Sequence, residues 1–264
     1  MSETIDLSTF SMIMCGMLLL VPVLVASYLK LGVTRSLLIS TVRMVVQLVL
    51  IGFFLEFLFK LNNAFVNIAW FLVMLLAAVF SVLASSGIKL KVFVFPVFLS
   101  LLLSNLFVVL YFNYFIVNLS FIFDARYMIA IGGMVLGNSL RSNVIGLGDF
   151  YKALNREEQL YFYKLSLGAS RFEAMLPFAK RSFTSALNPT IATMATMGIV
   201  SLPGMMTGQI LGGSVPLVAI KYQIAIMIAI LASTVLSISL SIFFTVGKSF
   251  DKYGILNKSI FKNP

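Results

Sequence analysis

Residues 201–213, SLPGMMTGQILGG, lie within apolar sequence and yet contain one proline and four glycines. These residue types end or loosen helices. Lipid cannot satisfy the backbone groups that a broken helix frees at membrane depth, so the break must be buried in protein or line a wet cavity. Such breaks recur at the substrate sites of transporters. We predict a broken helix over 189–213 that forms part of a pathway; the alternative is a glycine-rich turn between two spans.

The break supplies several candidate pathway residues, which are Pro203, Met205, Met206 and Gln209. Met194 and Met197 lie just upstream, so thioether groups gather around the break. Thioethers are soft ligands for a passing metal ion. Methionine is also a common gap filler in protein cores. The sequence leaves both interpretations open.

The composition indicates an all-α, polytopic membrane protein. Of the 264 residues, 60% are hydrophobic and 11% are charged, and the mean hydropathy is +1.05. A soluble domain carries about twice that charged fraction. Histidine is absent, which removes the commonest transition-metal ligand and the usual proton shuttle. The single cysteine, Cys15, excludes a disulfide within the chain.

Seven stretches approach the length of about 20 apolar residues that a membrane span needs. They are residues 7–29, 37–59, 64–84, 92–110, 124–140, 189–211 and 217–246. Most of the 19 lysines and arginines lie in alternate connections between these stretches. By the positive-inside bias, we expect the amino terminus outside, and the carboxyl terminus and the connection 141–188 in the cytosol. The net charge of +10 is therefore a topology signal and does not indicate nucleic-acid binding.

Polar residues within the predicted spans are further pathway candidates. Arg43 and Gln47 are four residues apart on one helical face of the second span. Arg43 either extends to the cytosolic headgroups or faces the bundle interior, and Gln47 beside it favours the interior. In the fifth span, Gly133 and Gly137 have the spacing that lets helices approach closely. Asn138, which follows them, is interpreted as a packing residue or as part of a pathway.

The cytosolic connection contains two helix-start signals. Asn155 is followed by Glu158, and Ser170 by Glu173, each with the spacing of a capping box. We expect Gly168 to end the first helix. The second helix is expected to stop at Pro177, so that the pair makes a compact elbow.

The elbow carries more apolar surface than two short helices can cover. Its aromatic residues are Tyr161, Phe162, Tyr163, Phe172 and Phe178. Such a surface needs the bilayer interface or another protein as its partner. The basic tail, residues 247–264, is expected to lie at the anionic inner leaflet. GKS at 247–249 is no phosphate-binding loop, because Ile242 stands where that motif has its first glycine.

Several motifs resemble the Fet-type permease family of ABC transporters. They are RMVVQL (43–48), GMVLGNS (133–139), LSLGAS (165–170), GIVSLPGMMTGQILGG (198–213) and YQIAIM (222–227). The resemblance spans nearly the whole chain. Bacterial members of that family are associated with iron export and oxidative-stress resistance, and plant relatives with aluminium tolerance.

The resemblance implies a single permease domain over 1–264 in the cell (inner) membrane, paired as a homodimer with two separate ATPase subunits. ATP and Mg²⁺ would bind to the ATPase, and this chain would hold no cofactor. The segment 141–188 would couple the two subunits, as in ABC importers, through Leu165, Gly168, Ser170, Phe172, Leu176 and Pro177. The chain departs from the importer pattern by a shorter spacing, with Glu158 further upstream, and from the family pattern by Ala192, where an asparagine is expected.

The sequence thus predicts a transport subunit without its own ATP site, which exports iron or another metal. The alternative is a secondary transporter or channel in which the broken helix selects the solute and an ion gradient supplies the energy. A membrane enzyme is disfavoured, because the chain shows no constellation of nucleophile and base.

Overall fold

The structure is a computed structural model that describes residues 7–251 and 254–261. Its regular elements are all helical, and the only β-pairings within the described residues are isolated bridges. The order is α1 (Thr9–Met17), α2 (Leu20–Tyr28), α3 (Thr34–Leu61), α4 (Ala64–Ser85), α5 (Leu90–Tyr111), the π-helical turn η1 (Phe112–Ile116), α6 (Ala125–Arg156), α7 (Glu158–Ser166), α8 (Arg171–Thr196), α9 (Gly204–Leu211), α10 (Pro216–Ser249) and the 3₁₀ turn η2 (Lys258–Ile260).

Five segments of the described chain are long and apolar enough to cross a membrane. They are Thr9–Tyr28, Thr34–Leu61, Ala64–Ser85, Phe93–Ile116 and Pro216–Ser249. The all-helical, multi-pass fold is confirmed, and these segments match five of the seven predicted spans. The predicted span 124–140 is the first half of α6, whose second half is more polar. The predicted span 189–211 is not one helix, because α8 ends at Thr196 and α9 begins at Gly204.

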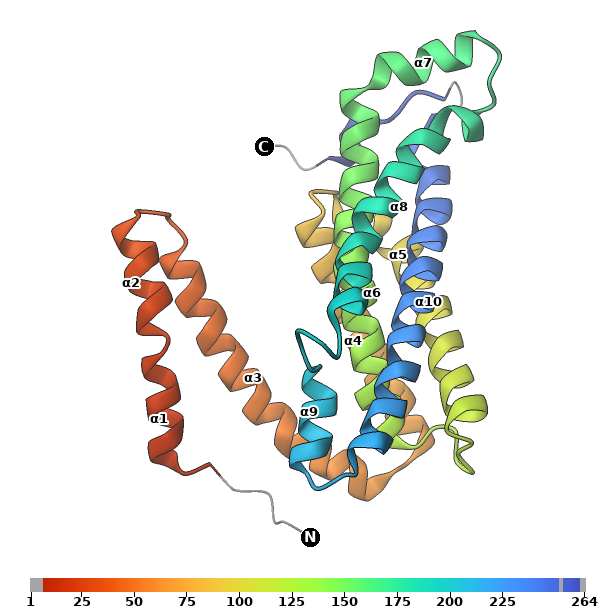
Figure 1. Cartoon of the computed structure of the whole chain (residues 1–264). Coiled ribbons are helices and arrows are strands. Elements are labelled where there is room, and N and C mark those ends of the chain that lie inside the picture. The colour runs from red at the N-terminus through yellow and green to blue at the C-terminus, as the bar shows by residue number, and fades with distance from the viewer. Residues whose placement is uncertain (1–6, 252–253, 262–264) are drawn as a thin grey trace.

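α10 packs mainly against α5 and α6 (Figure 1). Along the face that meets them it carries a small hydroxyl residue at every fourth position, all fully buried: Ser233, Ser237, Ser241, Thr245 and Ser249. Side chains one helical turn apart share a face, so this stripe forms one continuous line. Small residues let the backbones approach closely, which is how helices pack in membranes.

Hydrogen bonds cross from this line of α10 to both neighbouring helices. The Oγ atoms of Ser100 in α5 and Ser241 are 2.6 Å apart. Those of Ser139 in α6 and Ser233 are 3.0 Å apart. Nδ2 of Asn143, also in α6, donates to Ser237 Oγ at 2.9 Å. We call these residues, together with the remaining hydroxyls of the α10 stripe, the polar seam.

Two glycines of α6 let α4 pack closely against it, but only one of them, Gly133, is at a predicted position. A Cβ at Gly132 would lie 2.9 Å from the Phe71 ring of α4. A Cβ at Gly133 would lie 3.1 Å from Met74 Cε, whereas one at Gly137 would meet nothing within 4 Å. Close packing therefore uses the adjacent pair 132–133, and the predicted role of Gly137 is wrong. The reason is that Gly137 faces away from α4, on an exposed part of the helix.

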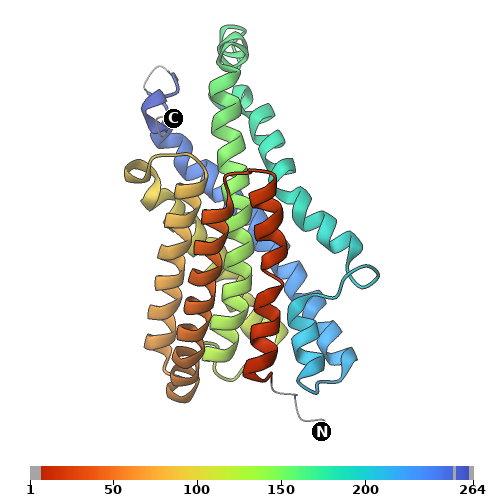
Figure 2. The ribbon, with the colours of Figure 1, turned by 90° about the vertical axis from the view of Figure 1, so that its left-hand side faces the viewer.

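The helices α1, α2 and α3 form an arm that is largely separate from the bundle (Figures 1 and 2). The arm meets the bundle at the end of α3, where Leu58 is fully buried against Ala125 and Ile129 of α6. Towards the α2–α3 turn the arm stands away from the bundle in Figure 1. Its long apolar surface is thus left to lipid or to another protein chain.

The connections that carry most of the basic residues lie at one end of the molecule. Figure 1 places the α2–α3 turn, the α4–α5 turn, α7 and the end of α10 at its upper end, and the start of α1 at the opposite end. This arrangement agrees with the alternation of charge in the sequence. The assignment of the upper end to the cytosol stays a prediction.

We predict that Ser237→Ala destabilises the protein by about 1 kcal/mol, because Asn143 then loses an interhelical acceptor in a site without water. Ser239→Ala is the matched control, since Ser239 Oγ bonds only within its own helix, to the Val235 carbonyl at 2.8 Å. Thermal unfolding in detergent should show a lower Tm for Ser237→Ala than for the control. Equal values would mean that the seam does not hold the bundle.

Candidate functional site

The elbow at the upper end begins differently from the prediction. α6 continues through Asn155 to Arg156, and Glu157 occupies the cap position of α7 without a side-chain cap hydrogen bond. Asn155 is therefore not an N-cap, because buried residues of α6 such as Ala153 and Leu154 keep the helix packed beyond the predicted start. The first part of the predicted coupling segment 141–188 is thus a continuation of α6.

The turn between α7 and α8 is as predicted. Gly168 has a φ of +88°, a left-handed conformation that glycine adopts without strain. The Ser170 hydroxyl accepts from the Glu173 backbone N–H at 3.3 Å, and the Glu173 carboxylate accepts from the Ser170 N–H at 2.7 Å. These are the two halves of a capping box. Hydrogen bonds from the side chain and backbone of Ser170 hold the pKa of the Glu173 carboxyl below its ordinary value.

α8 runs without interruption from Arg171 to Thr196, so the predicted stop at Pro177 is wrong. A proline inside a helix removes one backbone hydrogen bond. Tertiary packing compensates for this loss, since Ala174 and Phe178 on either side of Pro177 are buried in the main core. Further along, the Ser182 hydroxyl donates to the Gly146 carbonyl of α6.

The elbow leaves a group of apolar side chains uncovered at its tip. Tyr161 and Phe178 are buried, whereas Tyr163, Leu167 and Phe172 are exposed by 61%, 69% and 71%. The remaining coupling candidates divide similarly: Leu165 and Leu176 are half-buried and Pro177 is exposed. The predicted excess of apolar surface on the elbow is therefore present. Its partner stays a prediction.

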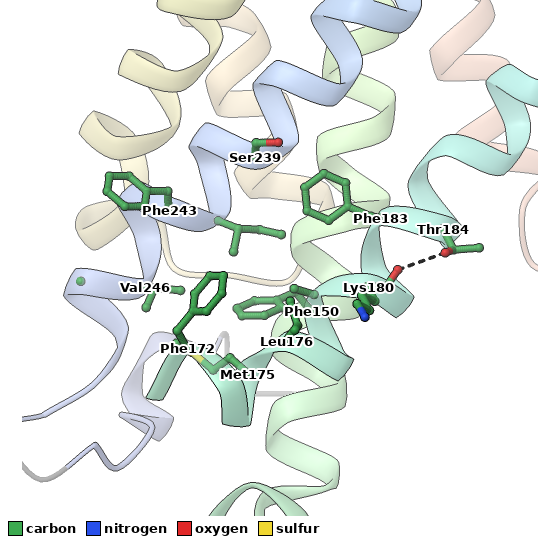
Figure 3. A pocket seen from close by; sticks show the side chains of 13 residues that line it. Phe150, Phe172, Met175, Leu176, Lys180, Phe183, Thr184, Ser239, Phe243 and Val246 are labelled. Carbon is green, nitrogen blue, oxygen red and sulfur yellow. Dashed lines mark hydrogen bonds between the residues drawn. The ribbon is translucent and has the colours of Figure 1, made fainter. Parts of the chain in front are cut away.

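An apolar groove of about 1020 Å³ lies beside the elbow, between α8 and α10. Figure 3 shows Phe172 and Phe183 approaching it from α8 and Phe243 from α10, with Phe150 of α6 at its base. Lys180 is the charged residue of its lining. The groove connects the tip of the elbow with the lipid-facing part of the bundle.

The described part of the carboxyl-terminal tail packs against the elbow. The expectation that the basic tail lies at the inner leaflet stays a prediction. The Tyr161 hydroxyl donates to the Gly254 carbonyl at 3.1 Å, and Lys258 pairs with Glu158 at 2.8 Å. The Lys89 N–H, in the α4–α5 turn, donates to the Ile260 carbonyl at 2.8 Å. Apolar side chains of the tail, Ile260 among them, are buried, which explains why this segment folds onto the protein. Parts of the predicted tail lie outside the described residues.

The predicted break is present at the opposite end of α8. Its expected burial is not found within one chain, because Ile199 is 91% exposed and Val200 77%. Residues 197–203 are not helical, and they turn back on themselves through a hydrogen bond from the Gly198 N–H to the Ser201 carbonyl at 2.9 Å. Gly198 has a φ of +88°. Pro203 then occupies the cap position of the short helix α9. Figure 2 shows the break projecting from the side of the molecule before α9 returns to α10.

A pocket of about 300 Å³ lies between α9, α10 and the start of α6. Met205 and Gln209 of α9 line it, together with Tyr127, Tyr222 and other residues, which are Arg126, Ala130, Ile131, Ser214 and Val218. This pocket has a larger proportion of polar lining residues than the groove beside the elbow. It is the place where predicted pathway residues converge, and we call it the outer pocket.

The other predicted pathway residues lie elsewhere. Arg43 and Gln47 are exposed on the arm, and Gln47 lines a hollow beside Trp70. Asn138 is half-buried, and its amide donates to the Met134 carbonyl of its own helix at 2.8 Å. Met206 is buried but lies outside the outer pocket. The structure therefore does not bring these residues together with Met205 and Gln209 in one chain.

Methionines from several elements gather beside the outer pocket. Met227 belongs to a group of buried residues in this region. Four other methionines pack against that group, namely Met134, Met194, Met197 and Met205. Sequence reasoning missed Met134, Met227 and the buried Gln223, whose amide nitrogen lies 3.9 Å from Met197 Sδ. A glutamine within the apolar run YQIAIM was the available signal. Among the described residues, no group of three or more histidine, cysteine or acidic side chains is placed to hold a metal ion.

We predict that Gly168→Ala destabilises the elbow by about 1 kcal/mol through backbone strain alone. The added Cβ would meet nothing within 4 Å, so no steric clash contributes. Gly137→Ala is the control, because its Cβ also has open space and its helix tolerates alanine. Thermal unfolding should show a lower Tm for Gly168→Ala only. A loss of the same size in both variants would contradict the role of the left-handed turn.

The comparisons with known proteins agree with this architecture. The probable iron export permease protein FetB of Escherichia coli is 28% identical over 93% of both chains. The membrane protein YjkA of Bacillus subtilis is 31% identical over 81% of this chain and 86% of its own length. The protein ALUMINUM SENSITIVE 3 of Arabidopsis thaliana is 38% identical over 45% of this chain and 44% of its own. No solved structure matches the chain.

The family described as "Uncharacterised protein family (UPF0014)" matches residues 9–250. This match covers nearly all of the helical bundle, the arm, the elbow and the break, and it includes each motif that carried the resemblance to Fet-type permeases. Relatives of the chain are named as membrane proteins, one of them as a permease. The chain therefore belongs to the UPF0014 family of multi-pass membrane proteins.

Proposed function

We propose that the chain is the membrane-spanning permease subunit of an ABC transporter, and that it exports iron or another metal at the expense of ATP hydrolysed by a separate ATPase subunit. The whole chain, 1–264, acts as one permease domain in the cell (inner) membrane. ATP and Mg²⁺ bind to the ATPase, and this chain holds no cofactor. The name of the Escherichia coli relative supports iron as the substrate.

The observation that carries the proposal is the uncovered apolar tip of the elbow. Leu167 and Phe172 are exposed by 69% and 71% at the end of the molecule that the basic residues assign to the cytosol. A monomeric protein rarely leaves such residues clustered in water unless they bind a partner. A cytosolic ATPase is the partner that a permease without a nucleotide site requires.

The elbow is also built to transmit force. Gly168 and the capping box fix the angle between α7 and α8, and the bond from Ser182 to Gly146 fixes α8 on α6. Movement of the tip would therefore move α6, which contributes to the polar seam, and α8, which ends at the break. Movement of these helices would alternate access to the outer pocket when ATP binds and is hydrolysed.

A permease homodimer accounts for the separate arm. The most apolar 18-residue stretch of α3 buries none of its residues within one chain. This stretch nevertheless includes Arg43 and Gln47. Polar residues at membrane depth usually face protein or a wet cavity. A second copy of the chain would cover this surface and give those two residues a protein environment.

A gradient-driven transporter or channel is the second candidate. The break beside a partly polar pocket favours it, since broken helices of this kind select solutes in secondary transporters. It is disfavoured because none of the described residues that line the outer pocket is acidic, whereas proton- or sodium-coupled transport commonly uses membrane-embedded carboxylates. The two candidates differ in whether the chain needs a partner in order to transport.

We predict that Phe172→Ala weakens the binding of the permease to its ATPase subunit by about thirtyfold, because burial of one phenylalanine contributes about 2 kcal/mol. Phe243→Ala is the matched control: its ring is 74% exposed and lines the same groove, but it lies on α10 within a span. The control should retain the ATPase. Equal retention by both variants would remove the elbow as the docking surface.

A further inference from the structure

Gln223 has an amide oxygen that is buried and unpartnered. The side chain is 7% exposed, and no group in the structure bonds to its Oε1. Its Nε2 makes a long contact of 3.9 Å to Met197 Sδ. Leaving a buried acceptor without a donor costs about 1–3 kcal/mol. Efficient packing alone would place an apolar residue at this position, so the oxygen needs an explanation.

The Met197 thioether contacts this amide, and four further methionines belong to the same packed region. Met134, Met194, Met197 and Met205 come from α6, α8, the break and α9, and they pack against the same buried group as Met227 of α10. We call these five residues the methionine cluster. Gap filling explains one or two methionines in a core. It does not explain why five methionines belong to one packed region beside an amide oxygen that has no partner.

A second amide oxygen without a partner lies close to the cluster. Oε1 of Gln209 is buried and unbonded, and Gln209 lines the outer pocket beside Met205. The available groups are thus neutral Lewis bases: thioether sulfurs and amide oxygens. Rotation of the Gln223 amide by half a turn would place its oxygen beside Met197 Sδ, so that two bases would face each other. A cation between them would satisfy both.

We infer that the methionine cluster and Gln223 form a transit site for a reduced, thiophilic metal ion. Neutral sulfur ligands favour soft and borderline ions such as Cu⁺, Ag⁺ and Fe²⁺. Hard ions such as Mg²⁺ demand a shell of oxygen ligands that this site does not offer. The inference deepens the proposed function and rests on it for the direction of transport. It assigns to the metal a reduced state and a sulfur-containing site.

The position of the site suits passage. Met197 begins the non-helical break, and Met205 lines both the cluster and the outer pocket. An ion held at Met197 therefore needs to move past only α9 to reach the pocket. Neutral ligands also release an ion more readily than carboxylates do, because no opposite charge holds it.

The test uses Ag⁺ as a redox-stable probe and the full-length permease in detergent, in a Cys15→Ser background because Cys15 is an exposed free thiol. Titration calorimetry should show saturable binding of one Ag⁺ per chain. Met197→Leu, Met205→Leu and Gln223→Leu should each weaken this binding by about tenfold or more. Cu⁺ added without oxygen should displace Ag⁺, and Mg²⁺ should not.

Met74→Leu is the matched control, since Met74 is partly buried between α4 and α6 but lies outside the cluster. Its Ag⁺ affinity should equal that of the parent. Absence of saturable binding, equal loss in Met74→Leu and Met197→Leu, or failure of Cu⁺ to displace Ag⁺ would each overturn the inference. X-ray absorption of the Ag⁺ complex should show sulfur neighbours; an oxygen-only shell would also overturn it. The proposed function fails separately, if the ATPase does not bind or drive transport.

Discussion

The structure depends on satisfying hydroxyl and amide groups where water is absent. Lipid offers no hydrogen-bond partner, so polar side chains at membrane depth are stabilised by partners inside the protein. α10 meets this constraint by aligning its hydroxyls in the polar seam, where Ser241 bonds to Ser100 of α5 and Ser237 to Asn143 of α6. The same small residues bring the three helices close together. Close packing and polar satisfaction are therefore one feature of the bundle.

The other parts of the molecule can be understood by their relation to this bundle. The elbow is fixed to it through α6 and α8, whereas the arm touches it only near Leu58. The break lies where α8 leaves α6, and the short α9 returns the chain to α10. Under the proposed function, a partner bound at the elbow would move α6 and α8 relative to the rest of the bundle and so change access to the outer pocket.

Much of the fold followed from local chemistry. Apolar length located five spans, the capping box at Ser170 and the left-handed Gly168 defined the turn between α7 and α8, and the glycine-rich stretch located a break. The errors arose where tertiary packing overrode local signals. α6 continues beyond the predicted cap at Asn155, and α8 continues beyond Pro177, because buried contacts stabilise both helices. The contact of Gln223 with Met197 joins α10 to the break across 26 positions of the sequence, so no local pattern could reveal it.

The central claim is that this chain transports only when a separate ATPase acts on its elbow. The most direct measurement is iron flux into inverted vesicles that contain the chain alone, the chain with its ATPase, or both with ATP. The account predicts accumulation of iron only in the last case. Iron flux of the same size through the chain alone, without ATPase or ATP, would contradict it and favour a channel or a gradient-driven transporter.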